Sequence, residues 1–202
     1  MRAAVASAAA AFRIGREVLG TQSHSMDVLD VGGGFATSES PDGELDFAGH
    51  GIASGLREAL DEHFPPGCGV RIIAEPGRFF AERPFCVACE IFGVKRGDVT
   101  RYYQTDGVYG GFNCIQNDLA KPVAVALRVE SVGNGGDGVP CTVFGPTCDS
   151  HDVVSREAVL PADLENGDWL VWPRFGAYTR CAGANFNGID SANARIWYTW
   201  TE

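Results

Sequence analysis

The 202-residue sequence predicts an α/β segment followed by a segment built mainly of β-strands. Two observations predict this order. Before residue 80, helix-like stretches alternate with apolar runs that end in glycine-containing loops. After residue 80, short apolar runs alternate with turn sequences rich in Gly, Asn and Asp. The first pattern favours parallel strands in a sheet or barrel, and the second favours an antiparallel sandwich or barrel. We therefore expect two domains, residues 1–80 and 81–202.

The first segment contains two helix–strand units. The expected helices cover residues 2–19 and 48–64, and the expected strands cover residues 26–31 and 70–74. Four apolar residues are expected on one face of the first helix: Phe12, Ile14, Val18 and Leu19. Four more recur at four-residue spacing in the second: Ile52, Leu56, Leu60 and Phe64. Two such units cannot close a (β/α)8 barrel, which needs about 250 residues.

The second segment is expected to contain six short strands separated by turns such as 96–98 and 165–168. The expected strands cover residues 85–94, 100–105, 123–129, 141–144, 169–172 and 195–199. Cys86 and Cys89 form a CxxC inside the first of them. A buried strand with two small thiols explains this pair better than a zinc or redox site, because no second CxxC follows.

The composition argues against several classes of function. A net charge of -10 and a pI near 4.8 argue against a nucleic-acid partner, since phosphate binding needs a basic face. No run of about 18 apolar residues occurs, so we expect no membrane span. The alanine-rich start has some features of a signal or transit peptide, but its helical pattern favours an amphipathic helix. Seven cysteines without a tight framework favour reduced thiols and a cytoplasmic protein.

Two loops at strand ends predict a ligand. Residues 32–34 are three glycines that follow the first strand, and residues 75–78, EPGR, follow the second. Glycine lets the backbone approach a ligand and direct N–H groups at an anion, and the Arg78 guanidinium can bind a phosphate with two hydrogen bonds. One such loop is explained equally well as a tight turn. Two such loops at equivalent strand ends predict a phosphorylated ligand. Neither loop is a P-loop or a GxGxxG motif.

Residues 145–152, GPTCDSHD, place a thiol, two carboxylates and an imidazole close together. A metal site is one interpretation, but four candidate ligands within five residues are too close for one tetrahedral site without longer-range partners. The other interpretations are a nucleophile, a proton donor and a polar turn. Within this stretch, we expect His151 to be a solvated loop residue.

Six stretches, in chain order, resemble the C-terminal half of eukaryotic ornithine decarboxylases: DVGGGF, RIIAEPGRFF, DGVYGGFNCI, GPTCDSHD, GDWLVWPRFGAYT and FNG. These enzymes belong to the fold-type III pyridoxal-phosphate-dependent decarboxylases, which include the diaminopimelate decarboxylases. The resemblance covers about residues 20 to 200, and Gly-Pro-Thr-Cys-Asp favours the ornithine branch. It implies part of a (β/α)8 barrel that binds pyridoxal 5'-phosphate over residues 1–80 and a C-terminal β domain over residues 81–202.

The resemblance also implies cofactor contacts. Gly34 and the loop of Pro76, Gly77 and Arg78 would hold the cofactor phosphate, and Tyr178 would also reach it. Glu75 would pair with the pyridinium nitrogen, which keeps the ring protonated so that it can absorb the electrons left when CO2 departs.

For the substrate, the resemblance implies that Asp118 and Asp149 receive the distal ammonium of a diamino acid. Cys148 would protonate the product carbon after CO2 loss, and Phe186 would line the site. In a homodimer with shared active sites, Cys148 and Asp149 would serve the partner's site, and Asp152 would assist at the same interface.

The sequence also departs from that family. The Schiff-base lysine of the family lies on an early barrel strand, whereas the only lysines here are Lys95 and Lys121, both in the second segment. The upstream histidine that stacks on the cofactor and the first part of the barrel are also missing, and Asn117 replaces a tyrosine. We therefore expect an N-terminally truncated enzyme for the conversion of L-ornithine to putrescine, inactive by itself, whose half barrel exposes an apolar face.

The alternative is a non-catalytic homologue, like an antizyme inhibitor, that binds a regulatory protein. The retained cofactor and site residues argue against it, because a protein that only binds a regulator has little reason to keep them.

Overall fold

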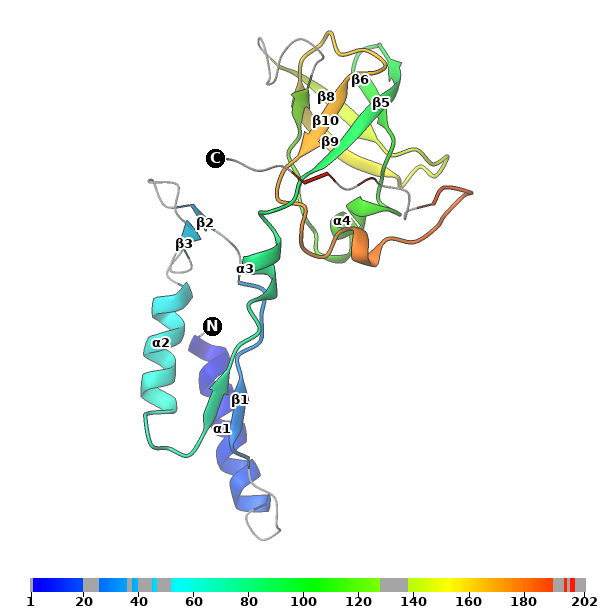
Figure 1. Cartoon of the computed structure of the whole chain (residues 1–202). Helices are drawn as coiled ribbons and strands as arrows, with labels where there is room; N and C mark the ends of the chain where they lie inside the picture. The colour runs from blue at the N-terminus through cyan, green and yellow to red at the C-terminus, as the bar shows by residue number, and fades with distance from the viewer. Residues whose placement is uncertain are drawn as a thin grey trace. The chain divides into compact units, whose positions relative to one another are not determined.

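The computed structural model describes residues 2–19, 26–35, 38–39, 45–46, 52–127, 138–190, 195 and 197–198. The chain divides into two compact units, Met1–Glu82 and Arg83–Glu202, which we call unit 1 and unit 2 (Figure 1). Among the described helices, none combines the length and the apolar character that crossing a bilayer requires.

Unit 1 confirms the expected order of helix, strand, helix and strand. Its main elements are α1 (Arg2–Leu19), β1 (Val28–Asp30), α2 (Ile52–His63), β4 (Arg71–Ile73) and the short α3 (Gly77–Ala81). β1 and β4 run parallel, with Leu29 opposite Ile72. Two further strands, β2 (Ser38–Glu39) and β3 (Leu45–Asp46), form an antiparallel pair that the sequence did not predict. Residues 48–51 of the expected second helix lie outside the described residues.

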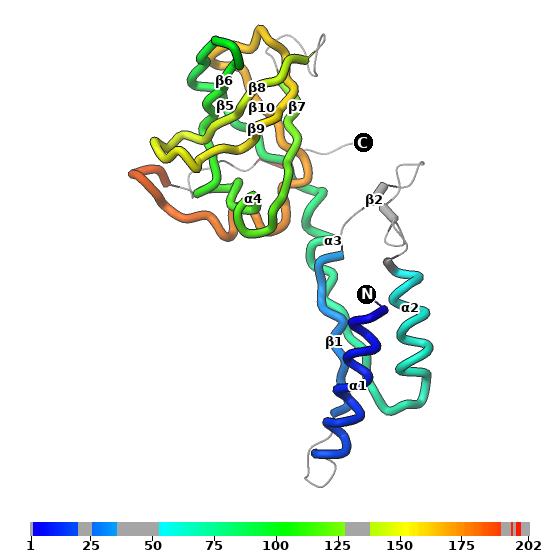
Figure 2. Tube along the Cα trace, turned by 180° about the vertical axis from the view of Figure 1, so that it is seen from behind, coloured from blue at the N-terminus to red at the C-terminus, as the bar shows by residue number. Residues whose placement is uncertain are grey.

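The core of unit 1 forms between α1, α2 and β1, whose backbones lie side by side in Figure 2. The rings of Phe12 and Phe64 meet edge to face, with centroids 5.3 Å apart. The expected apolar face of α1 is wrong in part, because Val5 and Phe12 are buried whereas Ile14 is 63% exposed. Two residues along an α-helix correspond to a rotation of about 200°, so Ile14 lies opposite Phe12.

Unit 2 is a six-stranded sheet that coils around its own core (Figure 1), with the strand order β7-β10-β5-β6-β8-β9. The bounds are β5 (Val87–Lys95), β6 (Thr100–Gln104), β7 (Val125–Leu127), β8 (Val139–Phe144), β9 (Val153–Leu160) and β10 (Trp169–Trp172). The expectation of a purely antiparallel sheet is wrong, because β6 and β8 run parallel. The connection between them contains α4 (Cys114–Asn117) and β7, and is long enough for the crossover that parallel neighbours need.

One strand of unit 2, β9, was not predicted. Its two ends are buried, but the centre is polar and half-buried or exposed, so the sequence lacks a regular apolar alternation. Its pairing with β8 is also irregular, with register shifts between Cys141 and Phe144. The expected strands at 85–94, 100–105, 141–144 and 169–172 are confirmed to within two residues at their ends, and β7 confirms residues 125–127 of the strand expected at 123–129. Of the strand expected at 195–199, the described residues 195, 197 and 198 are not in a strand, and the other two lie outside the described residues.

The core of unit 2 contains polar side chains whose hydrogen bonds are satisfied. Trp172 Nε1 donates to Gln104 Oε1 at 3.0 Å, and Gln104 Nε2 donates to the Asp106 carbonyl at 2.9 Å. Trp172 and Gln104 are fully buried, and burial of an unbonded polar group would cost free energy. The network therefore fixes the end of β6, from which the loop toward Tyr109 begins.

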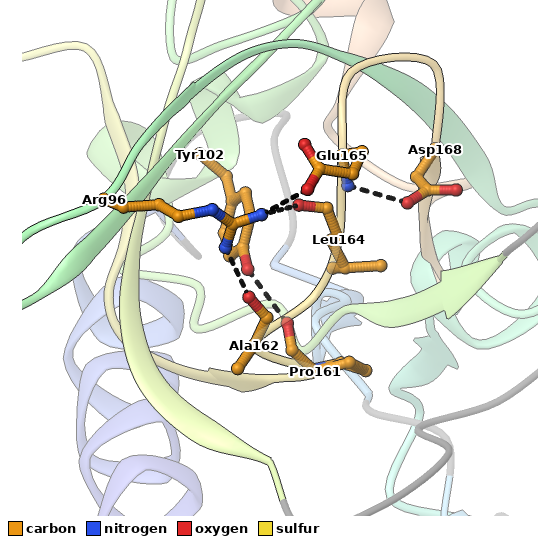
Figure 3. A network of polar contacts seen from close by, with 7 residues as sticks. All are labelled: Arg96, Tyr102, Pro161, Ala162, Leu164, Glu165 and Asp168. Atoms are coloured by element: carbon orange, nitrogen blue, oxygen red, sulfur yellow. Dashed lines mark hydrogen bonds and ion pairs between the residues drawn. The ribbon is translucent and has the colours of Figure 1, made fainter.

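Arg96, in the turn between β5 and β6, fixes the connection between β9 and β10 (Figure 3). Its guanidinium donates to the carbonyls of Ala162 at 2.6 Å and Leu164 at 3.2 Å, and to Glu165 Oε1 at 2.6 Å. The Glu165 N–H in turn donates to Asp168 Oδ2 at 2.8 Å. One planar group thus satisfies three acceptors on the same loop.

Replacing Arg96 by lysine is expected to lower the free energy of unfolding of unit 2 by about 1–2 kcal/mol, because an ammonium cannot reach all three acceptors. The effect stays modest because the arginine side chain is 47% exposed. Urea unfolding followed by tryptophan fluorescence measures it, since every tryptophan lies in unit 2. Arg156→Ala, on the exposed part of β9, is the control and should change this value by less than about 0.5 kcal/mol. Equal losses in the two variants would contradict the role of Arg96.

Candidate functional site

The two glycine-containing loops lie side by side at the ends of β1 and β4. The Glu75 N–H donates to the Gly32 carbonyl at 2.8 Å. Gly32 and Gly34 have φ angles of 71° and 75°, a region that residues with side chains rarely adopt. At Gly33, a Cβ atom would lie 2.4 Å from the Glu75 carbonyl oxygen. The close approach of the two loops therefore requires glycine.

Charged groups are gathered at the same strand ends. Arg78 lies in the first turn of α3, with Nη1 3.7 Å from Glu82 Oε2, and the Glu75 side chain is exposed. The Gly77 N–H donates to the Glu75 carbonyl at 2.7 Å, and a Cβ atom at Gly77 would meet nothing within 4 Å. A guanidinium suits a phosphate, the free space beside Gly77 lets a ligand approach the backbone, and a carboxylate suits a protonated ring nitrogen. These residues therefore fit pyridoxal phosphate.

In unit 2 the structure brings Cys148, Asp149 and Phe186 together. Cys148 and Asp149 lie on the loop between β8 and β9. Asn187 Nδ2 donates to Cys148 Sγ at 3.1 Å. The Phe186 ring stacks on Tyr109 with centroids 3.9 Å apart, and the Tyr109 hydroxyl donates to Asp149 Oδ2. Three separate loops thus meet around one thiol and one carboxylate.

Asp152 gives the loop that carries Cys148 its shape. Its side chain is 1% exposed, and its Oδ1 accepts from the Val108 N–H at 2.9 Å. Its Oδ2 accepts from the Thr147 N–H at 3.0 Å and from the Thr147 hydroxyl at 2.7 Å. Gly107 and Gly145 make room for it, because a Cβ atom at either would lie 2.1 Å from Asp152 Oδ1. Asp152 therefore ties the loop after β6 to the loop after β8.

Asp149 is held as a carboxylate. It accepts from the His151 backbone N–H at 2.9 Å and from the Tyr109 hydroxyl, and the His151 ring Nδ1 lies 3.1 Å from its Oδ1. These hydrogen bonds, with the backbone N–H first, lower the pKa of Asp149 to about 2. The hydrogen bond to Asp149 also raises the pKa of Tyr109. Asp149 is therefore ionised at neutral pH and can bind a cation.

Tyr178 lies on a strained turn of unit 2. It is 57% exposed and has a φ of 54°, which is costly for a residue with a side chain and often marks functional sites. Buried Asn113 holds this turn, because its Nδ2 lies within hydrogen-bond distance of the carbonyls of Thr179, at 2.5 Å, and Gly110, at 2.6 Å. The remaining predicted site residue, Asp118, is exposed and follows α4.

Three residues of the Asp149 cluster were not predicted as site residues: Tyr109, His151 and Asn187. Tyr109 and Asn187 lie inside stretches that carried the resemblance, but their partners are far away in the sequence. His151 was expected to be solvated; its ring is 82% exposed, yet it contacts Asp149. Over the described ranges, no three His, Cys, Asp or Glu side chains are grouped so as to hold a metal ion.

Comparisons with known proteins confirm the resemblance. Residues 28–176 match a family described as "Pyridoxal-dependent decarboxylase, C-terminal sheet domain". The chloroplastic ornithine decarboxylase of Nicotiana glutinosa is 43% identical over 183 residues, which are 87% of this chain and 40% of that protein. The ornithine decarboxylase of Schizosaccharomyces pombe is 40% identical over 188 residues, which are 88% of this chain and 40% of that protein. The chain thus spans less than half the length of these relatives.

Solved structures are similar as well. The arginine decarboxylase of Paramecium bursaria Chlorella virus aligns with a TM-score of 0.78 and 33% identity, covering 93% of this chain and 48% of that one. The lysine/ornithine decarboxylase of Vibrio vulnificus, complexed with cadaverine, aligns with a TM-score of 0.68 and 27% identity, covering 92% and 48%.

Proposed function

Because this chain belongs to the pyridoxal-dependent decarboxylase family, through its C-terminal sheet domain, we propose that it forms the C-terminal part of an L-ornithine decarboxylase that makes putrescine. One observation carries the proposal. The loop between β8 and β9 holds a thiol, Cys148, next to a carboxylate, Asp149, that three hydrogen bonds keep ionised. A carboxylate binds the distal ammonium of a diamino acid, and a thiol can donate a proton.

Under this proposal unit 1 is part of a (β/α)8 barrel. The parallel pair of β1 and β4, with α1 and α2 packed against it, has the arrangement of barrel units. Both ligand loops follow the carboxyl ends of their strands, where barrels carry their active sites. Val28, Ile72 and Ile73 on these strands are 37–40% exposed, and further barrel elements would cover them.

The cofactor would be held by the loop residues of unit 1. Gly34, Gly77 and Arg78 would bind its phosphate, with Pro76 shaping the loop and Tyr178 of unit 2 adding a contact. Glu75 would face the ring nitrogen and favour its protonated form. When bound, pyridoxal phosphate would accept the electron pair that remains on the carbon when CO2 leaves. The two lysines, Lys95 and Lys121, lie in unit 2, so no lysine of unit 1 is assigned to the cofactor.

The substrate would be oriented by unit 2. Asp149, together with Asp118, would bind the distal ammonium, while Phe186 would line the site against Tyr109. Cys148 would give its proton to the carbon that lost CO2, with the Asn187 amide orienting the sulfur. We further propose a homodimer in which Cys148 and Asp149 serve the partner's site. A cytoplasmic setting is consistent with seven free cysteines.

The test is complementation. The chain is coexpressed with the part of the Schizosaccharomyces pombe relative outside the matched segment, and CO2 release from carboxyl-labelled L-ornithine is measured. We expect release by the pair, and a loss of about 100-fold or more in kcat/KM for Asp149→Asn, because the ammonium loses its counter-ion. Glu157→Gln, on the exposed part of β9, is the matched control and should keep the rate.

Two results would overturn the proposal. The first is an Asp149→Asn variant with an unchanged kcat/KM for L-ornithine. The second is a complemented protein that binds pyridoxal phosphate but releases no CO2 from L-ornithine, L-lysine or L-arginine. That second result would favour a non-catalytic homologue that binds a regulatory protein.

A further inference from the structure

His151 contacts the carboxylate to which the proposed function assigns the substrate ammonium. Its backbone N–H donates to Asp149 Oδ1 at 2.9 Å, and its ring Nδ1 lies 3.1 Å from the same oxygen. An ionised carboxylate only accepts hydrogen bonds, so ring Nδ1 carries a proton. The His151 side chain is 82% exposed. A further proton can therefore reach Nε2 from solvent, and the ring has room to move away from Asp149.

The carboxylate has few acceptor positions left. It offers about four, and the Tyr109 hydroxyl, the His151 N–H and the His151 ring use three of them. An arriving ammonium has three donors and would bind better if the ring left. Of the three contacts, the ring is the one on an exposed side chain, whereas the others come from the backbone and from a tyrosine stacked on Phe186.

We propose that the His151 imidazole competes with the ligand's terminal ammonium for Asp149, so that ammonium binding strengthens as the imidazole loses its charge. This inference rests on the proposed function. A doubly protonated ring is a cation that pairs with Asp149 and repels a second cation. A neutral ring offers only a hydrogen bond and is displaced more easily. Histidine is the side-chain type that ordinarily changes charge between about pH 5 and pH 8, and the test therefore compares two pH values near these limits.

The groups around the pair support this direction. The titratable side chains beside His151 are Cys148, Asp149 and Asp152 on its own loop and Tyr109 on the loop after β6. Asp152 is buried and turned toward Val108 and Thr147, so Asp149 is the carboxylate that meets the ring. Asp149 stays ionised because hydrogen bonds hold its pKa at about 2, so its own charge does not change above pH 5.

The experiment measures the affinity of the 202-residue chain for 1,4-diaminobutane at pH 5.5 and pH 8.0, from the backbone amide NMR shifts of Asp149 and His151. The dissociation constant is expected to be about two- to fivefold larger at pH 5.5, the range that exposed ion pairs span. His151→Gln keeps a polar side chain without the charge and should bind equally at both pH values. His63→Gln removes a histidine that lies 3.9 Å from Glu62 in α2 and should behave like the unchanged chain.

Each outcome decides between the two proposals. If Asp149→Asn abolishes binding but His151→Gln keeps the pH dependence of the unchanged chain, the inference on His151 is overturned and the ammonium assignment stands. If 1,4-diaminobutane binds equally well to the unchanged chain and to Asp149→Asn, Asp149 does not bind the ammonium and both proposals are overturned. If it binds to neither, the inference on His151 is overturned, and the complementation assay decides the proposed function. A pH dependence that disappears only in His151→Gln, with His63→Gln unchanged, supports the inference.

Discussion

Replacing Asp152 by alanine is expected to lower the free energy of unfolding of unit 2 by about 3 kcal/mol or more. The substitution leaves the Val108 N–H and the Thr147 N–H and hydroxyl without their acceptor, in a place where the carboxylate is 1% exposed. Each buried donor that loses its partner costs about 1–3 kcal/mol, and water entering the space recovers part of that sum. Urea unfolding followed by tryptophan fluorescence gives the loss, and amide hydrogen exchange at Val108 and Thr147 shows where it arises.

Asp152→Asn is the matched variant for this prediction. The amide keeps the shape and one acceptor oxygen, so the bond from the Val108 N–H can survive while the Thr147 N–H faces a donor. We expect an intermediate loss of about 1–2 kcal/mol. Glu157→Gln, an exposed acid of β9, should change the value by less than about 0.5 kcal/mol. If Asp152→Ala keeps wild-type stability and the two amides stay protected, Asp152 does not hold the loops together.

The parts of the fold that the sequence predicted correctly depend on local patterns. The helices, β1 and β4 follow from apolar spacing within each stretch, and parallel pairing follows from their order. The pairing of β6 with β8 was missed because it joins segments separated by a long connection. β9 was missed because its centre is polar, so its sequence lacks the regular alternation of apolar and polar residues that predicts a strand.

In the candidate site, too, the residues within short stretches were predicted, whereas the contacts between distant residues were not. The glycine loops, Cys148 and Asp149 stand in short stretches that the sequence displays directly. The bond between Tyr109 and Asp149 joins residues 40 positions apart, and the bond between Val108 and Asp152 joins residues 44 apart. No local pattern encodes such contacts. Asp152 was therefore expected to assist at the dimer interface, whereas its carboxylate is 1% exposed and accepts hydrogen bonds from Val108 and Thr147.

Gly33→Ala is expected to lower the free energy of unfolding of unit 1 by about 3 kcal/mol. The added methyl group would lie 2.4 Å from the Glu75 carbonyl oxygen, which belongs to backbone and cannot rotate away. Relief requires that the two loops separate, which breaks the hydrogen bond from the Glu75 N–H to the Gly32 carbonyl. Because Glu75 and Arg78 depend on that contact for their placement, we also expect weaker binding of pyridoxal phosphate.

The circular dichroism signal of helices reports α1 and α2 of unit 1, whereas tryptophan fluorescence reports unit 2 alone. The two probes therefore distinguish a loss of stability in unit 1 from a loss in unit 2 within one full-length chain. Gly55→Ala is the control, since it lies inside α2 with nothing within 4 Å of an added Cβ atom. It should raise the stability of unit 1 by about 0.5–1 kcal/mol, because alanine favours a helix interior over glycine. A Gly33→Ala chain as stable as Gly55→Ala would show that the loops do not need glycine in order to meet.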